Sequence, residues 1–422
     1  MSKNENFVAG LDIGSAKTTA VIAEVVGDLP KHPTVKILGV GQAKTTGLRR
    51  NVVADIEEST RSIRKALEDA ERMAGVKVTT VYAGIAGEHV QAMTSTGIAS
   101  VTGSEISRAD IDRANAVARA QPIPQDRELI HAIPQEYAVD KNIGVRDPIG
   151  MIGTRLETEM YLVTIGSSPA MNLRKAVERA GYKVGELVLE PLASALAVLT
   201  DDEKELGVCL VEMGAGTTDV AVFHEGKIRH LGTIGLGGVN VTADIVHGLG
   251  VTQADAEKIK EQYGCVYEPM VDRADVIHLP STVAQGDRQI PRELLAHIMH
   301  QRTSEVFEMV CREVQQAGYI KKLAAGVVVT GGAAAQPGTA ELASDVFGTG
   351  ARIGLPGEFL GGLADNVAHA RFSTVVGLVQ YGAHRVALGG AMSKGRRISM
   401  SGATPSMDKL GQRVKTWLQD FF

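Results

Sequence analysis

The chain has 422 residues, 44% of them hydrophobic, and a formal net charge of −5. This length predicts two or more domains with ample core material, and the acidic balance argues against a general nucleic-acid binder. Three cysteines, Cys209, Cys265 and Cys311, are odd in number and lack metal-ligand spacing, which favours a reducing, cytoplasmic setting. The first six residues are polar, so no signal peptide is predicted. The absence of an apolar run of about 18 residues argues against a membrane span.

Residues 8–23 predict a hairpin, in which two β-rich runs flank a turn that carries Asp12, Gly14, Ser15 and Lys17. Backbone N–H groups that point into such a bend bind anions. Glycine lets a phosphate approach the backbone, Ser15 adds a hydroxyl donor and Lys17 adds a positive charge. Asp12 is suited to hold the water shell of a magnesium ion. Taken alone, the turn is better explained as an ordinary surface hairpin of an α/β protein.

Strands and helices alternate beyond this hairpin, which predicts a mixed sheet covered by helices. We expect strands at 35–41, 78–84, 160–167 and 184–189, and helices at 51–74, 169–180 and 190–196. In residues 85–163 the pattern of predicted elements changes. A β-like run is expected at 92–102, a helix at 108–121 and an extended piece at 129–140 that Pro134 breaks. This stretch is predicted to be an inserted subdomain.

Residues 210–223 repeat the first hairpin. Glu212, Gly214 and Thr218 stand in the register of Asp12, Gly14 and Thr18, and Gly216 and Thr217 lie in the second turn. Two such hairpins facing each other would clamp the phosphate tail of a nucleotide. The matching register favours this interpretation over two unrelated surface hairpins.

The rest of the second half supplies weaker signals. Residues 232–240 form a glycine-rich bend that opens a helix, and helix N-termini attract phosphates. A helix is predicted at 254–264, where the spacing of Glu257 and Lys260 by itself indicates a solvated ion pair. Residues 276–292 look irregular, with Arg288 and Arg292 exposed, and a long helix follows at 292–316. The run 327–334 predicts a buried strand ending in a double glycine, over which a base or ribose can lie.

Other nucleotide motifs are missing. Only two residues separate Gly14 from Lys17, so there is no P-loop, and the run 214–216 lacks the third glycine of the dinucleotide fingerprint. The pattern instead resembles the actin-like ATPases, whose phosphate hairpins, linking helix and adenosine loop match 12–18, 212–219, 190–196 and 331–334. Within that superfamily it resembles the FtsA family of bacterial cell-division proteins. Residues 133–140, 175–181, 205–209 and 323–332 carry this likeness, which runs from about 7 to 382.

The resemblance implies an α/β fold of two related lobes with the nucleotide cleft between them. The first lobe would comprise 1–84 and 164–195, with the FtsA-specific subdomain inserted at 85–163, and the second lobe 196–230 and 304–388. A small subdomain facing the nucleotide would occupy 231–303. A flexible basic linker at 389–406 and an amphipathic helix at 407–422 would end the chain.

It also implies roles for matching residues. Asp12 would position magnesium through water, and Glu212 and Glu190 would join it as catalytic carboxylates. ATP would contact Gly14, Ser15 and Lys17 from one side and Gly214, Gly216, Thr217 and Thr218 from the other. Glu257 and Lys260 would hold the ribose and base, with Gly237, Gly238, Gly331, Gly332 and Ala333 lining the remainder.

The implied partners are those of a division adaptor. Arg288, Arg292 and Arg302 lie where the family receives the acidic C-terminal peptide of FtsZ. The inserted subdomain would contact neighbouring copies in an actin-like filament and downstream division proteins. The expected location is the cytoplasmic face of the inner membrane at the division site.

One residue departs from the family pattern. The second phosphate hairpin usually begins with aspartate, which helps to polarise the attacking water, yet Glu212 stands here. One extra methylene shifts a carboxylate by about an ångström, and such a misplacement can cost roughly 100-fold in rate. Nucleotide binding with slow or absent hydrolysis is therefore predicted.

The tail supplies an independent signal. Residues 389–405 are rich in glycine and serine and contain Lys394, Arg396 and Arg397, which predicts the flexible basic linker. Beyond it, apolar side chains recur at helical spacing with basic residues on the other side. The predicted membrane-facing set is Met407, Leu410, Val414, Trp417, Leu418, Phe421 and Phe422, with Lys409, Arg413 and Lys415 toward anionic lipid. One such helix predicts modest, reversible anchoring that polymerisation would strengthen.

Two alternatives share the fold. A small-molecule kinase would need a substrate-facing aspartate beside the γ-phosphate and would have no use for the tail. A chaperone-type ATPase would need an appended substrate domain, for which the sequence beyond the last predicted strand is short.

Overall fold

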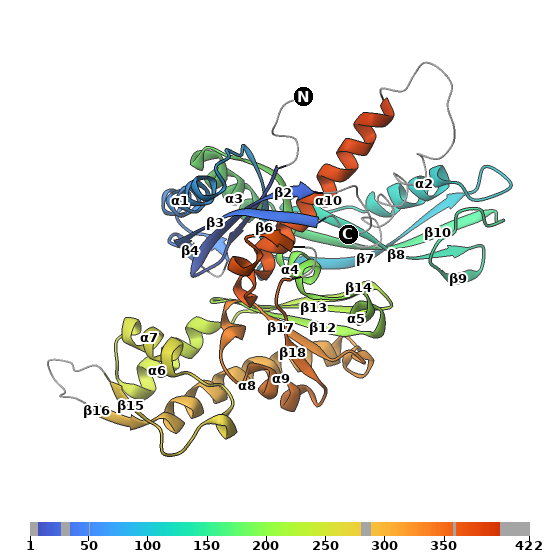
Figure 1. Ribbon diagram of the computed structural model, residues 1–422. Coiled ribbons are helices and arrows are strands. Elements are labelled where there is room, and N and C mark those ends of the chain that lie inside the picture. Colours follow the sequence, from blue (N-terminus) through green and yellow to red (C-terminus); the bar gives the residue numbers. More distant parts are fainter. Residues whose placement is uncertain (1–6, 27–33, 50, 280–287, 358–359, 397–422) are drawn as a thin grey trace.

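The computed structural model describes residues 7–26, 34–49, 51–279, 288–357 and 360–396. Two sheets form the centres of two lobes, one above the other in Figure 1. The sheet of the first lobe has the order β11-β6-β1-β2-β3-β19. Its strands are β1 Phe7–Ile13, β2 Lys17–Val26, β3 Thr34–Lys44, β6 Thr80–Ile85, β11 Lys183–Leu189 and β19 Leu360–Gly362.

The sheet of the second lobe repeats this plan. Its order is β14-β13-β12-β17-β18, and it consists of β12 Val208–Met213, β13 Thr218–His224, β14 Lys227–Ile234, β17 Val327–Thr330 and β18 Ala351–Ile353. In both lobes three consecutive antiparallel strands, β1-β2-β3 or β12-β13-β14, are followed by two strands that add in parallel, β6 and β11 or β17 and β18. The repeat predicted from the two hairpins therefore extends to the whole sheet.

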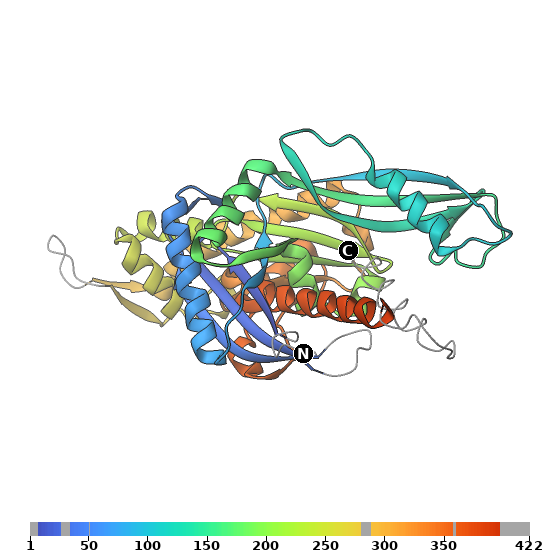
Figure 2. The ribbon, with the colours of Figure 1, turned by 90° about the horizontal axis from the view of Figure 1, so that it is seen from above.

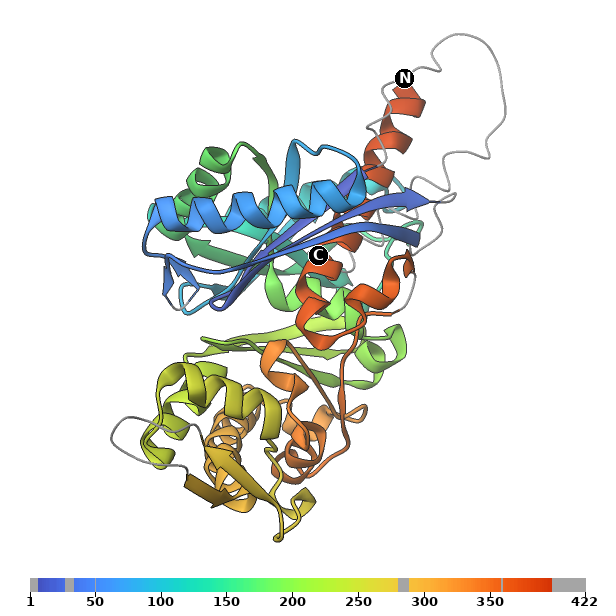
Figure 3. The ribbon, with the colours of Figure 1, turned by 60° about the vertical axis from the view of Figure 1, so that its left-hand side comes forward.

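Helices cover both faces of each sheet. Along β2, Ala20 and Ile22 pack into the core beneath α1 Ile56–Ala74 and α3 Ser167–Ala180. Val21 and Ala23 pack into the opposite core, which contains α4 Glu190–Val198 and α10 Ser373–Arg396. Alternate residues of one strand thus enter two cores, as expected for a sheet buried on both sides. Figure 3 shows α1 on one side of this sheet and α10 on the other. The second lobe is covered by α5 Asp201–Leu206, α8 Arg292–Gln316 and α9 Thr339–Phe347.

The inserted subdomain is a separate sheet that projects away from the first lobe (Figure 2). Its order is β7-β10-β8-β9, with strands β7 Gln91–Ser100, β8 Arg127–Val139, β9 Asn142–Val145 and β10 Arg155–Gly166, covered by α2 Arg108–Arg119. The prediction that Pro134 breaks this stretch was wrong. Strand β8 runs through it because the register shifts there, leaving Gln135 without a partner across the ladder, and a bulge accommodates a residue without an N–H.

The small subdomain contains α6 Gly238–Leu249, α7 Gln253–Tyr263 and a short antiparallel pair, β15 Val276–Leu279 with β16 Arg288–Pro291. The prediction of an irregular segment at 276–292 was therefore wrong for its described residues. Ile277, Leu279 and Ile290 alternate inward and are buried, so a two-residue period was present but short. The remaining elements are the pair β4 Leu48–Arg49 and β5 Val52–Val53 and five short 3-10 turns at Glu268–Met270, Ile320–Lys322, Gly332–Ala335, Ala364–Val367 and Ala370–Phe372.

Two helix boundaries also differ from prediction. Helix α1 begins at Ile56 rather than at 51, because Asn51 has a positive φ of 59° and the Asp55 side chain caps the helix by accepting from Glu58 N. Gly75 ends it in the left-handed region, as predicted. At the other end of the chain α10 extends to Arg396, so the linker predicted from residue 389 is helical over its first part. The sequence there continues Ala391-Met392-Ser393-Lys394, and alanine, methionine and lysine are good helix formers. Residues 397–422, including the predicted amphipathic helix, lie outside the described residues.

Candidate nucleotide site

The two predicted phosphate hairpins have the same geometry. Asp12 pairs with Thr19 in the first hairpin, and Glu212 pairs with Asp219 in the second. A Cβ atom added to Gly14 would lie 3.2 Å from the Lys17 carbonyl oxygen, and one added to Gly214 would lie 3.1 Å from that of Thr217. The prediction of a duplicated hairpin is thus confirmed down to the shape of the turn.

The tips of the two hairpins meet between the lobes. A Cβ atom on Gly216 would lie 2.7 Å from Ser15 Oγ, so this close approach requires glycine. Thr218 is buried and its hydroxyl donates to the Leu236 carbonyl at 2.9 Å. The turns that the sequence assigns to phosphate therefore face each other across a single narrow space.

The glycine-rich bend before α6 supports the second hairpin. The amides of Gly238 and Val239 donate to the carbonyls of Gly214 and Ala215 at 3.0 and 2.9 Å. A Cβ atom on Gly237 would lie 2.7 Å from both carbonyl oxygens. Because these first amides of α6 are used within the protein, the expectation that the helix N-terminus binds phosphate is not supported for them. The bend positions the hairpin instead.

Four carboxyl groups gather beside the hairpins. Burial, together with the charges of Asp12, Glu212 and Asp219, raises the pKa of Glu190 well above its ordinary value. Burial likewise raises the pKa of Asp12 to about 7, that of Glu212 to about 8 and that of Asp219 to about 6. Nearby like charges and lost hydration both disfavour ionisation. The charge of a nearby divalent cation would favour their ionised forms, although among the described residues no three His, Cys, Asp or Glu side chains are arranged to ligate a metal directly.

These shifts predict a pH-dependent stability. A carboxyl group with a raised native pKa binds protons more tightly in the folded state, so its contribution to stability is full below the unfolded pKa and is lost as the pH rises through the folded one. For Glu212 the loss falls between about pH 4.5 and about pH 8. In magnesium-free buffer the thermal midpoint should fall by about 5 °C or more from pH 5 to pH 8. Glu212→Gln should flatten that slope, and an unchanged slope in this variant would assign the dependence to other groups.

The sequence missed several residues that complete this site. Asp219 accepts from the hydroxyls of Thr233 at 2.6 Å and Thr217 at 3.2 Å. Glu212 Oε1 accepts from the Thr374 hydroxyl of α10, while its Oε2 is buried without a hydrogen-bond partner. The position of Asp219 directly opposite Glu212 in the hairpin was a usable signal. No local sequence pattern predicted Thr374, because it lies far from Glu212 along the chain.

The residues predicted to hold the ribose and base also come together. Lys260 is buried and its Nζ donates to Glu257 Oε2 at 2.8 Å, to Thr242 Oγ1 at 2.7 Å and to the Gly238 carbonyl at 3.2 Å. Burial acts to raise the pKa of Glu257. The hydrogen bonds from Lys260 and Thr242 and the charges of Lys260 and Lys17 outweigh it and lower this pKa. The spacing-based reading of a solvated ion pair was therefore wrong. Lys17 belongs to the opposite lobe, so Glu257 faces the cleft.

The double-glycine turn closes this side of the cleft. Gly331 has a φ of 92°, and a Cβ atom there would lie 2.4 Å from the Met213 carbonyl oxygen. Ala333 Cβ lies 3.4 Å from the position of a Cβ atom on Gly238. Ala333 thus lies against the start of α6, where a Cβ atom on Gly238 would also lie 3.8 Å from Lys260 Nζ.

The three arginines assigned to the FtsZ peptide lie elsewhere, on β16 and α8. Arg292 is half-buried and donates to Asp275 at 3.0 Å and to the Tyr263 carbonyl at 2.9 Å, so the prediction that it is exposed was wrong. Arg302 donates to Asp244 at 2.6 and 3.1 Å. Arg288 is also half-buried. These side chains form part of the small subdomain's outer structure and do not contribute to the cleft.

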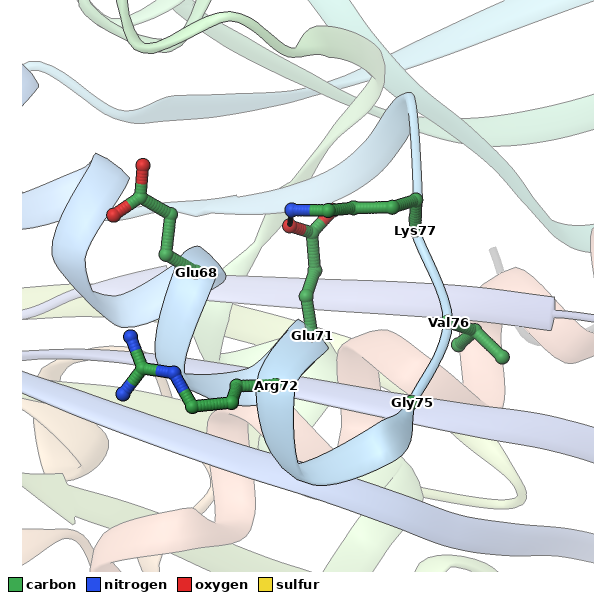
Figure 4. Close-up of a pocket in the computed structure, with 6 residues that line it drawn as sticks. All are labelled: Glu68, Glu71, Arg72, Gly75, Val76 and Lys77. Carbon is green, nitrogen blue, oxygen red and sulfur yellow. Dashed lines mark hydrogen bonds and ion pairs between the residues drawn. The ribbon is translucent and has the colours of Figure 1, made fainter.

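A separate pocket lies at the C-terminal end of α1 (Figure 4). It is lined by Glu68, Glu71, Arg72, Gly75, Val76 and Lys77. Lys77 and Glu71 form an ion pair of 2.5 Å there. The hairpin turns lie near the opposite end of α1, about 28 Å away along a helix of 19 residues. This pocket is distinct from the nucleotide site.

Two lobes of one plan, with duplicated hairpins meeting between them, define an actin-like protein. The family described as "Cell division protein FtsA" matches residues 209–377, and that described as "SHS2 domain inserted in FTSA" matches residues 87–164. The chain is 38% identical over 420 residues to cell division protein FtsA of Pseudomonas aeruginosa, covering 99% of this chain and 98% of that one. It therefore belongs to the FtsA family of cell division proteins.

Solved structures support the fold. A chain of a PilM–PilN type IV pilus biogenesis complex superposes with a TM-score of 0.63 at 15% identity, covering 89% of this chain and 98% of that chain. MreB5 of Spiroplasma citri bound to AMPPNP superposes with a TM-score of 0.53 at 14% identity, covering 92% and 99%. Both confirm the actin-like architecture. Membership of the FtsA family, with its inserted subdomain, favours a division protein over the kinase and chaperone alternatives.

Proposed function

We propose that this chain is a division adaptor that binds ATP and magnesium, polymerises like actin and tethers FtsZ filaments to the cytoplasmic face of the inner membrane at the division site. The observation that carries the nucleotide part is the pair of equivalent hairpins, whose turns face each other beside four carboxyl groups. The actin-like MreB5, which was solved with AMPPNP, has the same fold.

The residues present fit a nucleotide with its metal. The buried and unpartnered Glu212 Oε2 and the raised pKa values of Asp12, Glu190 and Asp219 indicate a site short of positive charge. Bound magnesium would supply that charge and neutralise the phosphates. Asp12 would hold it through water, while Lys17 and the turn residues 14–15 and 214–218 would orient the phosphates. Lys260, Glu257 and residues 331–333 would hold the ribose and base.

The proposed partner surfaces lie on the small subdomain, on the inserted subdomain and on the C-terminal segment 407–422. Arg288, Arg292 and Arg302 would receive the acidic C-terminal peptide of FtsZ, and the carboxylates of Asp275 and Asp244 would then compete with the peptide for two of these arginines. The inserted subdomain, which projects away from the first lobe (Figure 2), would contact neighbouring copies and downstream division proteins. Among the described residues, none of the helices has both the length and the apolar composition to cross a bilayer. Membrane attachment would come from the segment 407–422, whose sequence has apolar residues at helical spacing with basic residues on the other side.

Vesicle co-sedimentation tests the adaptor. Anionic vesicles, FtsZ and ATP would be mixed with the full chain or with a chain ending at Arg396, which leaves α10 whole. The full chain should pellet with vesicles and carry FtsZ with it, whereas truncation should lower vesicle binding by about tenfold or more, since it removes the whole apolar face. Trp417→Glu in the full chain should weaken pelleting without shortening the protein. Equal pelleting of all three chains would contradict the anchor. If the full chain pellets with the vesicles but FtsZ stays in the supernatant, the tether is contradicted.

A further inference from the structure

Asn51 occupies the tip of the short hairpin formed by β4 and β5, and the first lobe holds this hairpin rigidly. The Gly47 carbonyl accepts from the amides of Ala54 and Asp55 at 2.8 and 2.9 Å, which closes the base of the hairpin. Just before the hairpin, Thr45 donates its amide to the Ala16 carbonyl of the first phosphate turn at 3.0 Å. Asn51 itself has a φ of 59°, a conformation that asparagine and glycine adopt more readily than other residues.

The carboxamide of Asn51 connects the two phosphate turns. Ser15 Oγ donates to its Oδ1 at 2.7 Å, and its Nδ2 donates to Thr217 Oγ1 at 2.9 Å. The direction of these bonds is set by Asp219, because the Thr217 hydroxyl donates to that carboxylate at 3.2 Å and therefore accepts from Asn51. One side chain thus touches a predicted phosphate-binding hydroxyl from each lobe.

The position of Asn51 indicates which part of a bound nucleotide it would contact. The residues assigned to ribose and base, Lys260, Glu257 and the turn 331–333, all belong to the second lobe. The group of a nucleotide farthest from the base is its terminal phosphate, and Asn51 belongs to the other lobe, where it accepts from Ser15 of the first phosphate turn. A phosphate lying between the Ser15 and Thr217 hydroxyls would meet the carboxamide that now joins them. The amide is neutral and has two N–H donors, so it can bond a phosphate oxygen without charge repulsion.

We propose that Asn51 is a further nucleotide-binding residue, which contacts the terminal phosphate and makes the site prefer the triphosphate over the diphosphate. This inference rests on the proposed nucleotide binding and adds a determinant of specificity to it. The preference would arise because the carboxamide bonds a group that only the triphosphate carries.

Calorimetric titration of the full-length protein with AMPPNP or ADP, each with magnesium, tests this. Asn51→Gly retains the positive φ and removes the carboxamide, and should weaken AMPPNP binding by about tenfold, the value of one hydrogen bond to a charged group, while ADP affinity changes less than about twofold. Asn51→Asp keeps the side-chain size but replaces the donor with a charged acceptor, and should weaken AMPPNP binding further. Glu225→Gly is a matched control, because Glu225 also has a positive φ and follows the end of β13 that lies away from the phosphate turn.

The outcomes separate the inference from the proposed function. If neither nucleotide binds the unmodified protein, nucleotide binding itself fails. If both nucleotides bind and Asn51→Gly lowers both affinities equally, the terminal-phosphate contact is overturned. The same conclusion follows if Asn51→Gly raises both affinities, because Asn51 would then act only as a bridge between the lobes. A melting temperature within about 2 °C of the unmodified protein shows that a variant is folded, and Asn51→Asp alone carries the test if the glycine variant is not.

Discussion

Replacing Gly377 with alanine should lower the free energy of unfolding by about 1–2 kcal/mol, although alanine is the better helix former. Gly377 lies in α10 where this helix crosses α4, and an added Cβ atom would lie 1.7 Å from the Ala193 carbonyl oxygen and 2.3 Å from its carbonyl carbon. Both contacts are with backbone, so no side chain can rotate away. Overpacking of this kind costs about 1–3 kcal/mol and occasionally more, and the gain in helix propensity of about 1 kcal/mol offsets only part of it.

The other side of α10 leaves no room for a compensating shift. A Cβ atom on Gly10 of β1 would lie 2.7 Å from the Val375 carbonyl oxygen, so the helix already contacts the sheet backbone closely. Since α4 and α10 pack together in the core that joins the lobes, a displaced α10 should also widen the cleft. We therefore expect Gly377→Ala to weaken ATP binding as well as stability.

Urea unfolding followed by circular dichroism measures the stability change. Gly248→Ala in α6 is a matched helical control, because its added Cβ would meet only the Ile298 side chain, Cδ1 at 2.6 Å and Cγ1 at 3.4 Å, and the end of a flexible side chain can move. The control should retain most of the native midpoint. If both variants shift it equally, the close crossing of α4 and α10 does not limit stability.

Local pattern predicted much of this molecule because its central elements carry their own signals. The two hairpins were recognisable since the alternation of apolar residues fixes a strand's register, and the turn residues fix where the strand ends. The end of α1 at Gly75 and the whole of α8, Arg292–Gln316, followed from capping and helical spacing. Loop chemistry and periodicity are properties of neighbours in the sequence, and these are what a single sequence records.

The missed features depend on contacts between distant segments. Asn51 bridges Ser15 and Thr217, and Thr374 donates to Glu212, yet each pair is separated by a long stretch of chain. Burial decided the state of Lys260, which spacing alone assigned to solvent. Likewise, the use of the first α6 amides by the Gly214 and Ala215 carbonyls arises only when the bend folds onto the hairpin. Such long-range partners have no local sequence signature.

Replacing Glu212 with aspartate should raise ATP turnover by roughly 10- to 100-fold, the range that a misplaced catalytic group commonly costs. The Glu212 carboxyl reaches Thr374 of α10, whose hydroxyl donates to its Oε1. A shorter side chain would withdraw from α10 toward the cleft, where magnesium would favour its ionised form.

Phosphate release from the vesicle-bound protein, with magnesium and saturating ATP, measures this effect. Glu212→Gln is the matched control, since it keeps the length of glutamate but carries no charge, and it should leave turnover at or below that of the unmodified protein. Turnover that stays flat in Glu212→Asp, with AMPPNP affinity unchanged, would show that the methylene does not limit hydrolysis. A rise in the aspartate variant alone would assign the slow step to the position of this carboxyl group, because the glutamine variant alters charge without altering reach. The native glutamate would then act to prolong the ATP-bound state, and with it the lifetime of contacts that depend on that state.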